Sequence, residues 1–192
     1  MKKKIFFLFS VFLIYSISEA FAETNLQKNI IIKLTGTKTL SFQFNQKIAD
    51  KKSEGNCYIK YPLRMKCNYQ DIKKKVIIAN GKTVAIVKKK YKKVYYYPIK
   101  STPLFFILQK EKIINVIRKV KPNILDSKLI EFQFTDKNKN KIKIFFDKNL
   151  LEFRGWETTD IYSNEVSFKI SNLKINNQIV DDFFKIPKEE EL

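Results

Sequence analysis

Apolar side chains alternate with polar ones along most of this chain, and this spacing limits the folds open to it more than any other feature. Leu40, Phe42 and Phe44 are separated by single polar residues, and the same alternation runs through residues 57–61 and 65–69. Successive side chains of a strand point to opposite faces of its sheet. The alternation therefore predicts antiparallel strands with one buried face and one hydrated face.

The hydrophobic pattern predicts about ten to eleven strands in one sheet. Asn80-Gly81 separates the apolar runs 76–79 and 83–87, which is the sequence of a tight hairpin. Further strands are expected at residues 94–97, 129–135, 141–146, 151–158 and 165–173, with a last one at 183–187 before a loose tail at 188–192. A single antiparallel sheet of this size curls or closes on itself.

Two regions depart from the period of two and are expected to form short helices. Thr24 and Gln27 have the spacing of a capping box, which opens an amphipathic helix. A second helical region begins after Thr102-Pro103 and comprises residues 104–110 and 113–120. We expect these helices to cover the apolar face of the sheet.

Helices laid over one face of a curled sheet enclose either a packed core or a lidded apolar cavity, and the pattern of residues leaves both open. Residues 104–108 are apolar on every side, which is more than one face of a short surface helix needs. This helix is therefore either buried on both sides or a lid whose second face meets lipid or a partner.

The first residues have the layout of a secretory signal peptide. A short basic region, Lys2 to Lys4, precedes an apolar run at residues 5–17 and the small-x-small sequence Ala20-Phe21-Ala22. We expect cleavage after residue 22, which leaves a single domain of residues 23–192 in the periplasm. The alternative is an uncleaved membrane anchor, although the apolar run is shorter than the ~20 residues of a spanning helix.

Composition argues against an enzyme. The chain has no histidine and only four glycines, which excludes histidine-based nucleophile relays, zinc-binding HExxH helices and glycine-rich phosphate loops. Its carboxylates have no spacing typical of an acid/base or metal pair. We therefore expect no catalytic residue, no cofactor and no metal site.

The charge is strongly positive, with 38 Lys and Arg against 19 Asp and Glu. An exported protein rarely meets nucleic acid, and the basic residues are nearly all lysines spread along the chain, so no nucleic-acid partner is expected. The charge is either a solvated surface that follows codon bias or an attraction for anionic membranes or an acidic partner.

The two cysteines are predicted to face each other. If the strands on either side of Pro62 pair, residues whose numbers sum to 124 lie opposite one another, which places Cys57 opposite Cys67 on the apolar side. In an oxidising compartment such a pair forms a disulfide, and the alternative is two buried free thiols.

The order of these elements resembles the LolA family, the periplasmic carriers of outer-membrane lipoproteins. The resemblance rests on short motifs in the same order: LSFQFNQ at 40–46, YIKYPLRMKCNY at 58–69, IANGK at 78–82, STPL at 101–104 and DFFKIP at 182–187. It extends over essentially all of residues 23–192.

The resemblance implies an unclosed β-barrel with a helical lid over an apolar cavity that holds the acyl chains of a lipoprotein. Family members receive this cargo from an inner-membrane ABC transporter and deliver it to an outer-membrane acceptor, and we expect a monomer with that role. The cavity residues implied are Phe42, Phe44, Ile59, Met65, Tyr69, Leu104, Phe105 and Leu108.

The sequence departs from the family at two positions. Tyr61 stands directly before the hairpin proline, where many members have a basic residue that acts in opening the lid, and Cys67 stands where a large aromatic residue is common. Arg64 and Lys66 would supply charge near the cavity mouth, so Tyr61, Arg64 and Lys66 are the expected gating residues.

The rival functions are a sensing domain and a periplasmic hydrolase, and the absence of histidine and of paired carboxylates argues against the hydrolase. The same fold could sense lipids or lipoproteins through a protein interaction without passing them on. The related receptor LolB is itself a lipoprotein, and the absence of a cysteine at the expected cleavage site argues against that identity.

Overall fold

The computed structural model describes residues 24–136, 139–159 and 164–192, and the predicted signal peptide lies outside them. Eleven strands of this part form one antiparallel sheet in the order β6-β5-β4-β3-β2-β1-β11-β10-β9-β8-β7. They are β1 Thr39–Ile48, β2 Lys51–Lys60, β3 Arg64–Tyr69, β4 Lys75–Asn80, β5 Thr83–Lys88, β6 Lys93–Pro98, β7 Asn123–Leu125, β8 Leu129–Thr135, β9 Lys141–Asp147, β10 Phe153–Thr159 and β11 Glu165–Ile175. The predicted single sheet is confirmed, and its outermost strands, β6 and β7, leave it unclosed.

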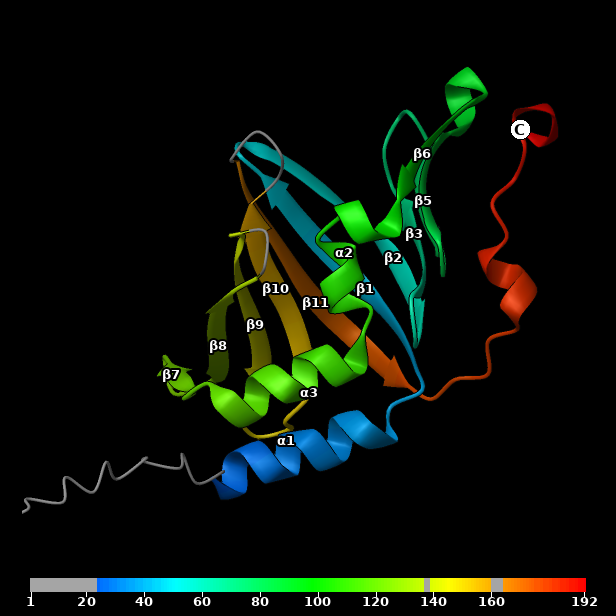
Figure 1. Cartoon of the computed structure of the whole chain (residues 1–192). Helices are drawn as coiled ribbons and strands as arrows, with labels where there is room; N and C mark the ends of the chain where they lie inside the picture. The colour runs from blue at the N-terminus through cyan, green and yellow to red at the C-terminus, as the bar shows by residue number, and fades with distance from the viewer. Residues whose placement is uncertain (1–23, 137–138, 160–163) are drawn as a thin grey trace, which may run out of the picture.

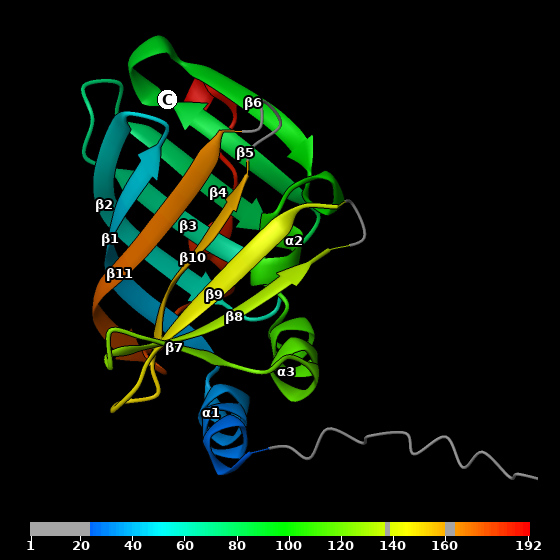
Figure 2. The same ribbon diagram turned by 90° about the vertical axis from the view of Figure 1, so that its left-hand side faces the viewer.

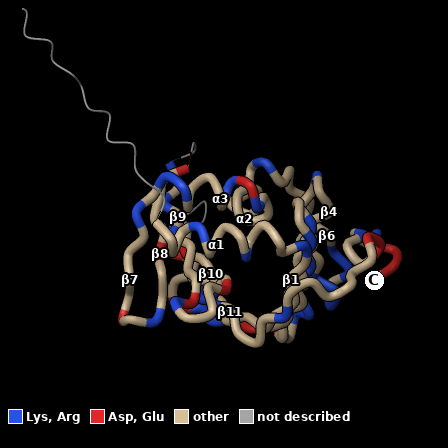
Figure 3. Tube along the Cα trace, turned by 90° about the horizontal axis from the view of Figure 1, so that it is seen from below, with Lys and Arg blue, Asp and Glu red and all other residues tan. Residues whose placement is uncertain are grey.

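The sheet consists of two meanders, β1–β6 and β7–β11, which meet where β1 pairs with β11. Along this seam Leu40 lies opposite Ile175 and Phe44 opposite Ile170. The sheet twists and curls (Figures 1 and 2), and Figure 3 shows the strands as a curved wall with the helices along its open side. The helices of the described chain are α1 Asn25–Gly36, α2 Leu104–Ile107 and α3 Lys110–Lys119.

Helix α1 begins with the predicted capping box. The Thr24 hydroxyl accepts a hydrogen bond from the Gln27 N–H, and the Gln27 side-chain oxygen accepts one from the Thr24 N–H at 2.9 Å. The Gln27 amide is fully buried and donates to the carbonyl oxygens of Ile117 and Val120, which lie at the end of α3. Because these carbonyls have no partner within α3, Gln27 caps that helix and fixes it to α1.

The second helical region differs from its prediction. One helix was expected at residues 104–110, but α2 ends at Ile107, and α3 begins at Lys110. Gln109 between them has an extended backbone. Thr102 does not cap α2, because its hydroxyl donates to the Ile99 carbonyl oxygen instead. The result is a single turn of helix set off from the longer α3.

The chain end also differs from its prediction. The expected strand at 183–187 is wrong, because residues Asp181–Phe184 form the 3-10 turn η3. The expected loose tail is wrong too, because the Glu189 carboxylate accepts a hydrogen bond from the Val94 N–H at 2.9 Å. Residues 177–192, which we name the C-terminal strap, run along the outer face of the β1–β6 meander (Figure 1).

The strap covers a second apolar cluster. The cluster consists of Val76, Ile78, Ala85, Val87 and Val94, on the outer face of β4–β6. Ile186 and Leu192 of the strap pack against it, and Phe184 is 1% exposed. The apolar residues near the chain end therefore serve as a cover for this face, which explains why they resemble a strand in sequence without pairing as one.

Candidate functional site

The residues implied as a cavity lie together on the concave face of the sheet. Those on strands are nearly fully buried: Phe42, Phe44, Ile59, Met65 and Tyr69. Of the three lid residues, Leu108 is buried, whereas Leu104 and Phe105 are half-buried. All eight belong to one continuous cluster or pack against it, so the structure brings the set together as a packed apolar core.

Four aromatic rings form a row across the middle of this face. Phe44 stacks on Phe168 of β11 at 4.7 Å between ring centroids and meets Tyr69 edge-on at 4.9 Å. Phe168 in turn stacks on Trp156 of β10 at 4.1 Å. The row runs from β3 to β10 and crosses the seam between the meanders.

The one ionisable group in this row is the Tyr69 hydroxyl, which donates to the Gln46 side-chain oxygen at 3.0 Å. Burial raises the pKa of Tyr69 far above its usual value, so the group stays neutral. The concave face is therefore uncharged along its centre, which suits an apolar ligand.

Helix α2 bridges the opening between the two edges of the sheet. The 3-10 turn η2, Ile99–Ser101, joins α2 to the end of β6, and the Phe106 ring lies 4.6 Å from the Phe134 ring of β8 on the other side. Leu104, Phe105 and Phe106 are only half-buried. A half-exposed apolar helix thus spans the gap, which is the arrangement of a lid.

Sequence reasoning did not single out Phe106 and Phe134 as a contact. Phe106 belonged to the apolar run 104–108, and Phe134 had the alternation of a strand. Each pattern predicts that its residue is buried, but neither predicts a contact between two residues that lie 28 positions apart.

Few polar contacts hold α2 in place. The Leu63 N–H donates to the Leu108 carbonyl oxygen at 2.9 Å, which ties the end of α2 to the turn between β2 and β3. The Gln109 amide donates to the Phe105 carbonyl oxygen at 2.6 Å, and the Lys112 ammonium lies 3.8 Å from the Phe105 ring centre. The first contact joins α2 to a distant turn and the other two join it to residues that follow it in sequence, whereas its contact with β8 is apolar.

The three expected gating residues fall in two places. Tyr61 packs against the concave cluster, and its hydroxyl is buried without a hydrogen-bond partner among the described residues. Burial raises the pKa of Tyr61 well above its usual value, so it provides no charge.

Arg64 and Lys66 lie on the outer face of β3, away from the concave cluster. The Arg64 guanidinium is 3.3 Å from the Asp181 carboxylate, and the Lys66 ammonium donates to the Phe183 carbonyl oxygen at 3.2 Å. Both side chains thus contact the C-terminal strap, and the structure does not place them beside the lid.

The cysteines have the predicted register. Cys57 of β2 lies opposite Cys67 of β3, and their Cα atoms are 4.1 Å apart. The sulfur atoms are bonded, and both residues are buried in the concave cluster.

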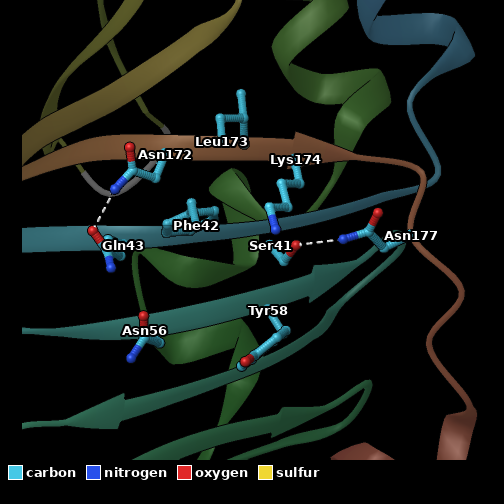
Figure 4. Close-up of a pocket in the computed structure, with 9 residues that line it drawn as sticks. All are labelled: Ser41, Phe42, Gln43, Asn56, Tyr58, Asn172, Leu173, Lys174 and Asn177. Carbon is cyan, nitrogen blue, oxygen red and sulfur yellow. Dashed lines mark hydrogen bonds between the residues drawn. The ribbon is translucent and has the colours of Figure 1, made fainter.

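A separate pocket of about 690 Å³ opens on the outer face of the seam. Figure 4 shows its lining, in which Gln43 accepts from the Asn172 amide and Ser41 accepts from the Asn177 amide. The pocket lies where the register between β1 and β11 shifts. Its lining residues are Ser41, Phe42, Gln43, Asn56, Tyr58, Asn172, Leu173, Lys174 and Asn177. This mostly polar lining does not suit an acyl chain.

The described residues do not provide an obvious reaction centre. They contain no group of three or more His, Cys, Asp or Glu side chains that could hold a metal ion. Asp147 has a pKa below its usual value because it accepts hydrogen bonds from the Leu150 and Asn149 N–H groups and lies 3.3 Å from Arg154. It therefore acts as a turn-forming ion-pair partner. None of the described helices is both long enough and apolar enough to cross a bilayer.

Comparisons with solved structures show the fold alone. An uncharacterized conserved protein from Thermus thermophilus superposes with a TM-score of 0.52 at 8% identity, over 84% of this chain and 93% of that chain. A LolA superfamily protein from Nitrosomonas europaea gives 0.42 at 8% identity, over 85% and 99%. The MucA/MucB complex of Pseudomonas aeruginosa gives 0.47 at 9% identity, over 85% and 60%.

The sequence comparison identifies the family. No curated protein matches the chain. The family model described as outer membrane lipoprotein carrier protein LolA matches residues 35–187, which is most of the chain. The chain therefore belongs to the LolA family of outer membrane lipoprotein carrier proteins.

Proposed function

We propose that this protein carries lipoproteins across the periplasm, with their acyl chains held on the concave face beneath α2. The observation that carries the proposal is the lid: a half-exposed apolar helix that spans an unclosed sheet and faces a continuous apolar cluster. Family membership supports the lipoprotein as cargo. The signal sequence at residues 1–22 would direct the chain to the periplasm.

The mechanism is partition of the cargo between apolar environments. Each methylene moved out of water contributes about 0.8 kcal/mol, so two or three acyl chains amount to tens of kcal/mol. A carrier can accept them only if its interior is nearly as apolar as the bilayer. The uncharged concave face meets this requirement, and the direction of transfer would then come from an inner-membrane ABC transporter and an outer-membrane acceptor.

Binding requires α2 to move away from the sheet, because the concave residues pack against one another. Acyl chains would replace the contacts that Leu104, Phe105 and Phe106 make with the cluster. An apolar contact is exchanged for another, so opening costs little once cargo is present. The Phe106–Phe134 contact is the part of this closure with no polar bond to break.

The carrier role is tested by release of a lipoprotein from membranes. Inner-membrane vesicles that contain an outer-membrane lipoprotein are incubated with the purified exported protein, with and without ATP. We expect the lipoprotein in the supernatant, bound one-to-one to this chain and only with ATP. If a known carrier releases the cargo from the same vesicles and this protein does not, the shuttle is wrong. Acyl-chain binding without release would favour the sensing role instead.

The role of α2 is tested by locking it. In the double variant Phe106→Cys/Phe134→Cys, a short bismaleimide joins the lid to β8, and we expect cargo uptake to fall at least tenfold. The Phe106→Cys variant treated with the same reagent is the matched control, because it carries the label without the tether. Equal uptake by the tethered protein and the control would show that α2 is not the lid.

A further inference from the structure

Two turns at one end of the β1–β6 meander form a strongly basic projection. One joins β3 to β4, and the other joins β5 to β6 through the 3-10 turn η1, Lys89–Tyr91. The Lys90 N–H donates to the Lys73 carbonyl oxygen at 3.5 Å, so the turns lie side by side. We name residues 70–75 and 88–93 the basic tip. Figure 1 shows η1 as a green turn far from the start of α1.

The charge of the tip is almost entirely of one sign. Its lysines are Lys73, Lys74, Lys75, Lys88, Lys89, Lys90, Lys92 and Lys93, and its single acidic residue is Asp71. The Asp71 carboxylate is engaged within its own turn, where it accepts a hydrogen bond from the Lys75 N–H at 3.0 Å. Glu189 belongs to the acidic turn Glu189–Glu191 of the strap and lies 3.5 Å from Lys93, so the end of the strap offsets part of the positive charge on the β6 side of the tip. From Ile72 to Lys110 the chain has eleven lysines and no acidic residue.

The tip also exposes one apolar side chain on each of its two turns. Ile72 is 84% exposed, the highest value among the large hydrophobic residues of the described chain, and Tyr91 is 51% exposed. Neither residue has a place in the clusters that stabilise the sheet. An exposed isoleucine on one turn and an exposed tyrosine on the adjacent turn, among lysines, form a combination that anchors proteins at the membrane interface. There apolar groups enter the acyl boundary and lysines meet anionic headgroups.

We propose that the basic tip docks this protein on anionic phospholipid surfaces, with Ile72 and Tyr91 inserted and the surrounding lysines on the headgroups. A protein partner fits less well, because a specific interface buries roughly 1,200 Å² or more and the apex of two turns offers little area. A bilayer needs only a few inserted side chains and a cluster of positive charge. Docking would hold the concave face and its lid close to a membrane during exchange of cargo.

The test measures partition onto vesicles that contain no lipoprotein, so it does not depend on the carrier role. The exported protein is sedimented with vesicles of phosphatidylglycerol and phosphatidylcholine in equal parts, and with phosphatidylcholine alone. We expect binding only to the anionic vesicles, and we expect it to weaken as salt screens the lysines.

Matched variants locate the binding surface. Each lysine near an anionic surface is worth about fivefold in affinity, so Lys73→Gln/Lys89→Gln/Lys90→Gln should weaken binding roughly a hundredfold. The control Lys28→Gln/Lys119→Gln/Lys121→Gln removes the same charge at the exposed ends of α1 and α3, and we expect a change of about twofold or less. All six side chains are exposed, so folding should be preserved in both variants.

The apolar contribution has its own pair of variants. Ile72→Ser should weaken binding roughly tenfold, because an inserted isoleucine is lost. Ile32→Ser on α1, where the side chain is 70% exposed, should leave binding unchanged.

Three results would overturn the proposal. The first is no binding to the anionic vesicles. The second is equal weakening by the two triple variants, which would assign binding to the overall charge of the chain. The third is tip-dependent binding to polyglutamate without binding to vesicles, which would make the partner an acidic protein.

Discussion

The two halves of the sheet bury their side chains in different ways. Strands β8–β11 are covered on the concave side by α1 and α3, and their outer face is charged, as where Lys143 lies 3.3 Å from Glu157. Strands β4–β6 have a buried apolar cluster on the outer face, beneath the C-terminal strap. One half thus depends on helices inside the curl and the other on a segment wrapped around it.

The two covers are also attached differently. The buried Gln27 amide fixes α1 to α3 from within the core. Hydrogen bonds of Asn177 hold the start of the strap, and further along the Asp181 carboxylate lies 2.6 Å from Lys60 and 3.3 Å from Arg64 on the surface. Exposed ion pairs contribute at most about 1 kcal/mol, whereas loss of a buried hydrogen-bonded group costs more. The strap-covered half should therefore open at lower free energy than the helix-covered half.

The largest effect is expected in the helix-covered half. Phe132 of β8 is fully buried and lies 6.0 Å from the Phe146 ring. Phe132→Ala should lower the free energy of unfolding by about 3–5 kcal/mol, because it removes a core ring and leaves a cavity. Urea unfolding followed by circular dichroism measures it. Phe145→Ala, a half-buried ring on the outer face of β9, should cost less than half as much. Equal losses of unfolding free energy in the two variants would show that the concave side of this half is not its main core.

The next effect concerns the disulfide between β2 and β3. The sequence separation of the cysteines is 10. Removing the disulfide should lower the free energy of unfolding by about 2–3 kcal/mol, because the unfolded chain then gains conformational entropy. Cys57→Ala/Cys67→Ala tests this by urea unfolding. Alkylation of the unfolded wild-type protein without reductant should add no mass, and two adducts would show free thiols instead.

A smaller effect is expected in the strap. Phe184→Ala removes a fully buried ring, yet the loss cannot exceed the free energy that keeps the strap docked. We expect about 1–2 kcal/mol, with faster hydrogen exchange confined to the strap and β4–β6. A loss as large as that of Phe132→Ala, spread over the whole sheet, would show that the strap is part of the global core.

The smallest effect is the pH dependence of the strap. Lys60 and then Arg64 hold the pKa of Asp181 below its usual value, and a hydrogen bond from Val94 with nearby Lys93 does the same for Glu189. Because these pKa values fall on docking, the stabilisation is present above the ordinary values near 4 and is lost as the pH falls through the lowered ones. Hydrogen exchange in η3 should rise below about pH 4, before the sheet unfolds.

A substitution at the same carboxylate checks this prediction. Asp181→Asn should give the fast exchange already at neutral pH, because the charge that Lys60 and Arg64 contact is gone. If wild type and variant exchange alike at every pH, the ion pairs do not hold the strap.

Alternation made most of the sheet predictable, because a period of two depends on local sequence alone. It predicted most of the strand positions and the pairing of Cys57 opposite Cys67. The C-terminal strap was not predicted, although residues 76–79 and 84–87 are continuously apolar rather than alternating. Such runs are typical of strands buried on both faces, and that signal indicates a second cover.

The candidate site was predictable only as a set of residues sharing a face. Parity placed Phe42, Phe44 and Met65 on the concave side, but whether they pack or line a cavity depends on the distance to the lid, which no local pattern encodes. The same parity places Arg64 and Lys66 on the outer face, where they contact the strap. The end of α2 depends on the Leu63–Leu108 hydrogen bond, a contact between distant parts of the chain.

The seam between β1 and β11 determines how late in synthesis or export the sheet can finish folding. Each meander consists of strands that are neighbours in sequence, so each can form by local pairing. The pairing of β1 with β11 is different, because Leu40 lies opposite Ile175 and cannot pair before Ile175 is available. A contact over such a separation forms slowly, and only after the last strand is available. A chain leaving a ribosome or a translocation channel from its first residue therefore stays in two unjoined parts until nearly its whole length has emerged. This delay keeps it in a form that can be threaded and leaves the aromatic row exposed until the final strand pairs.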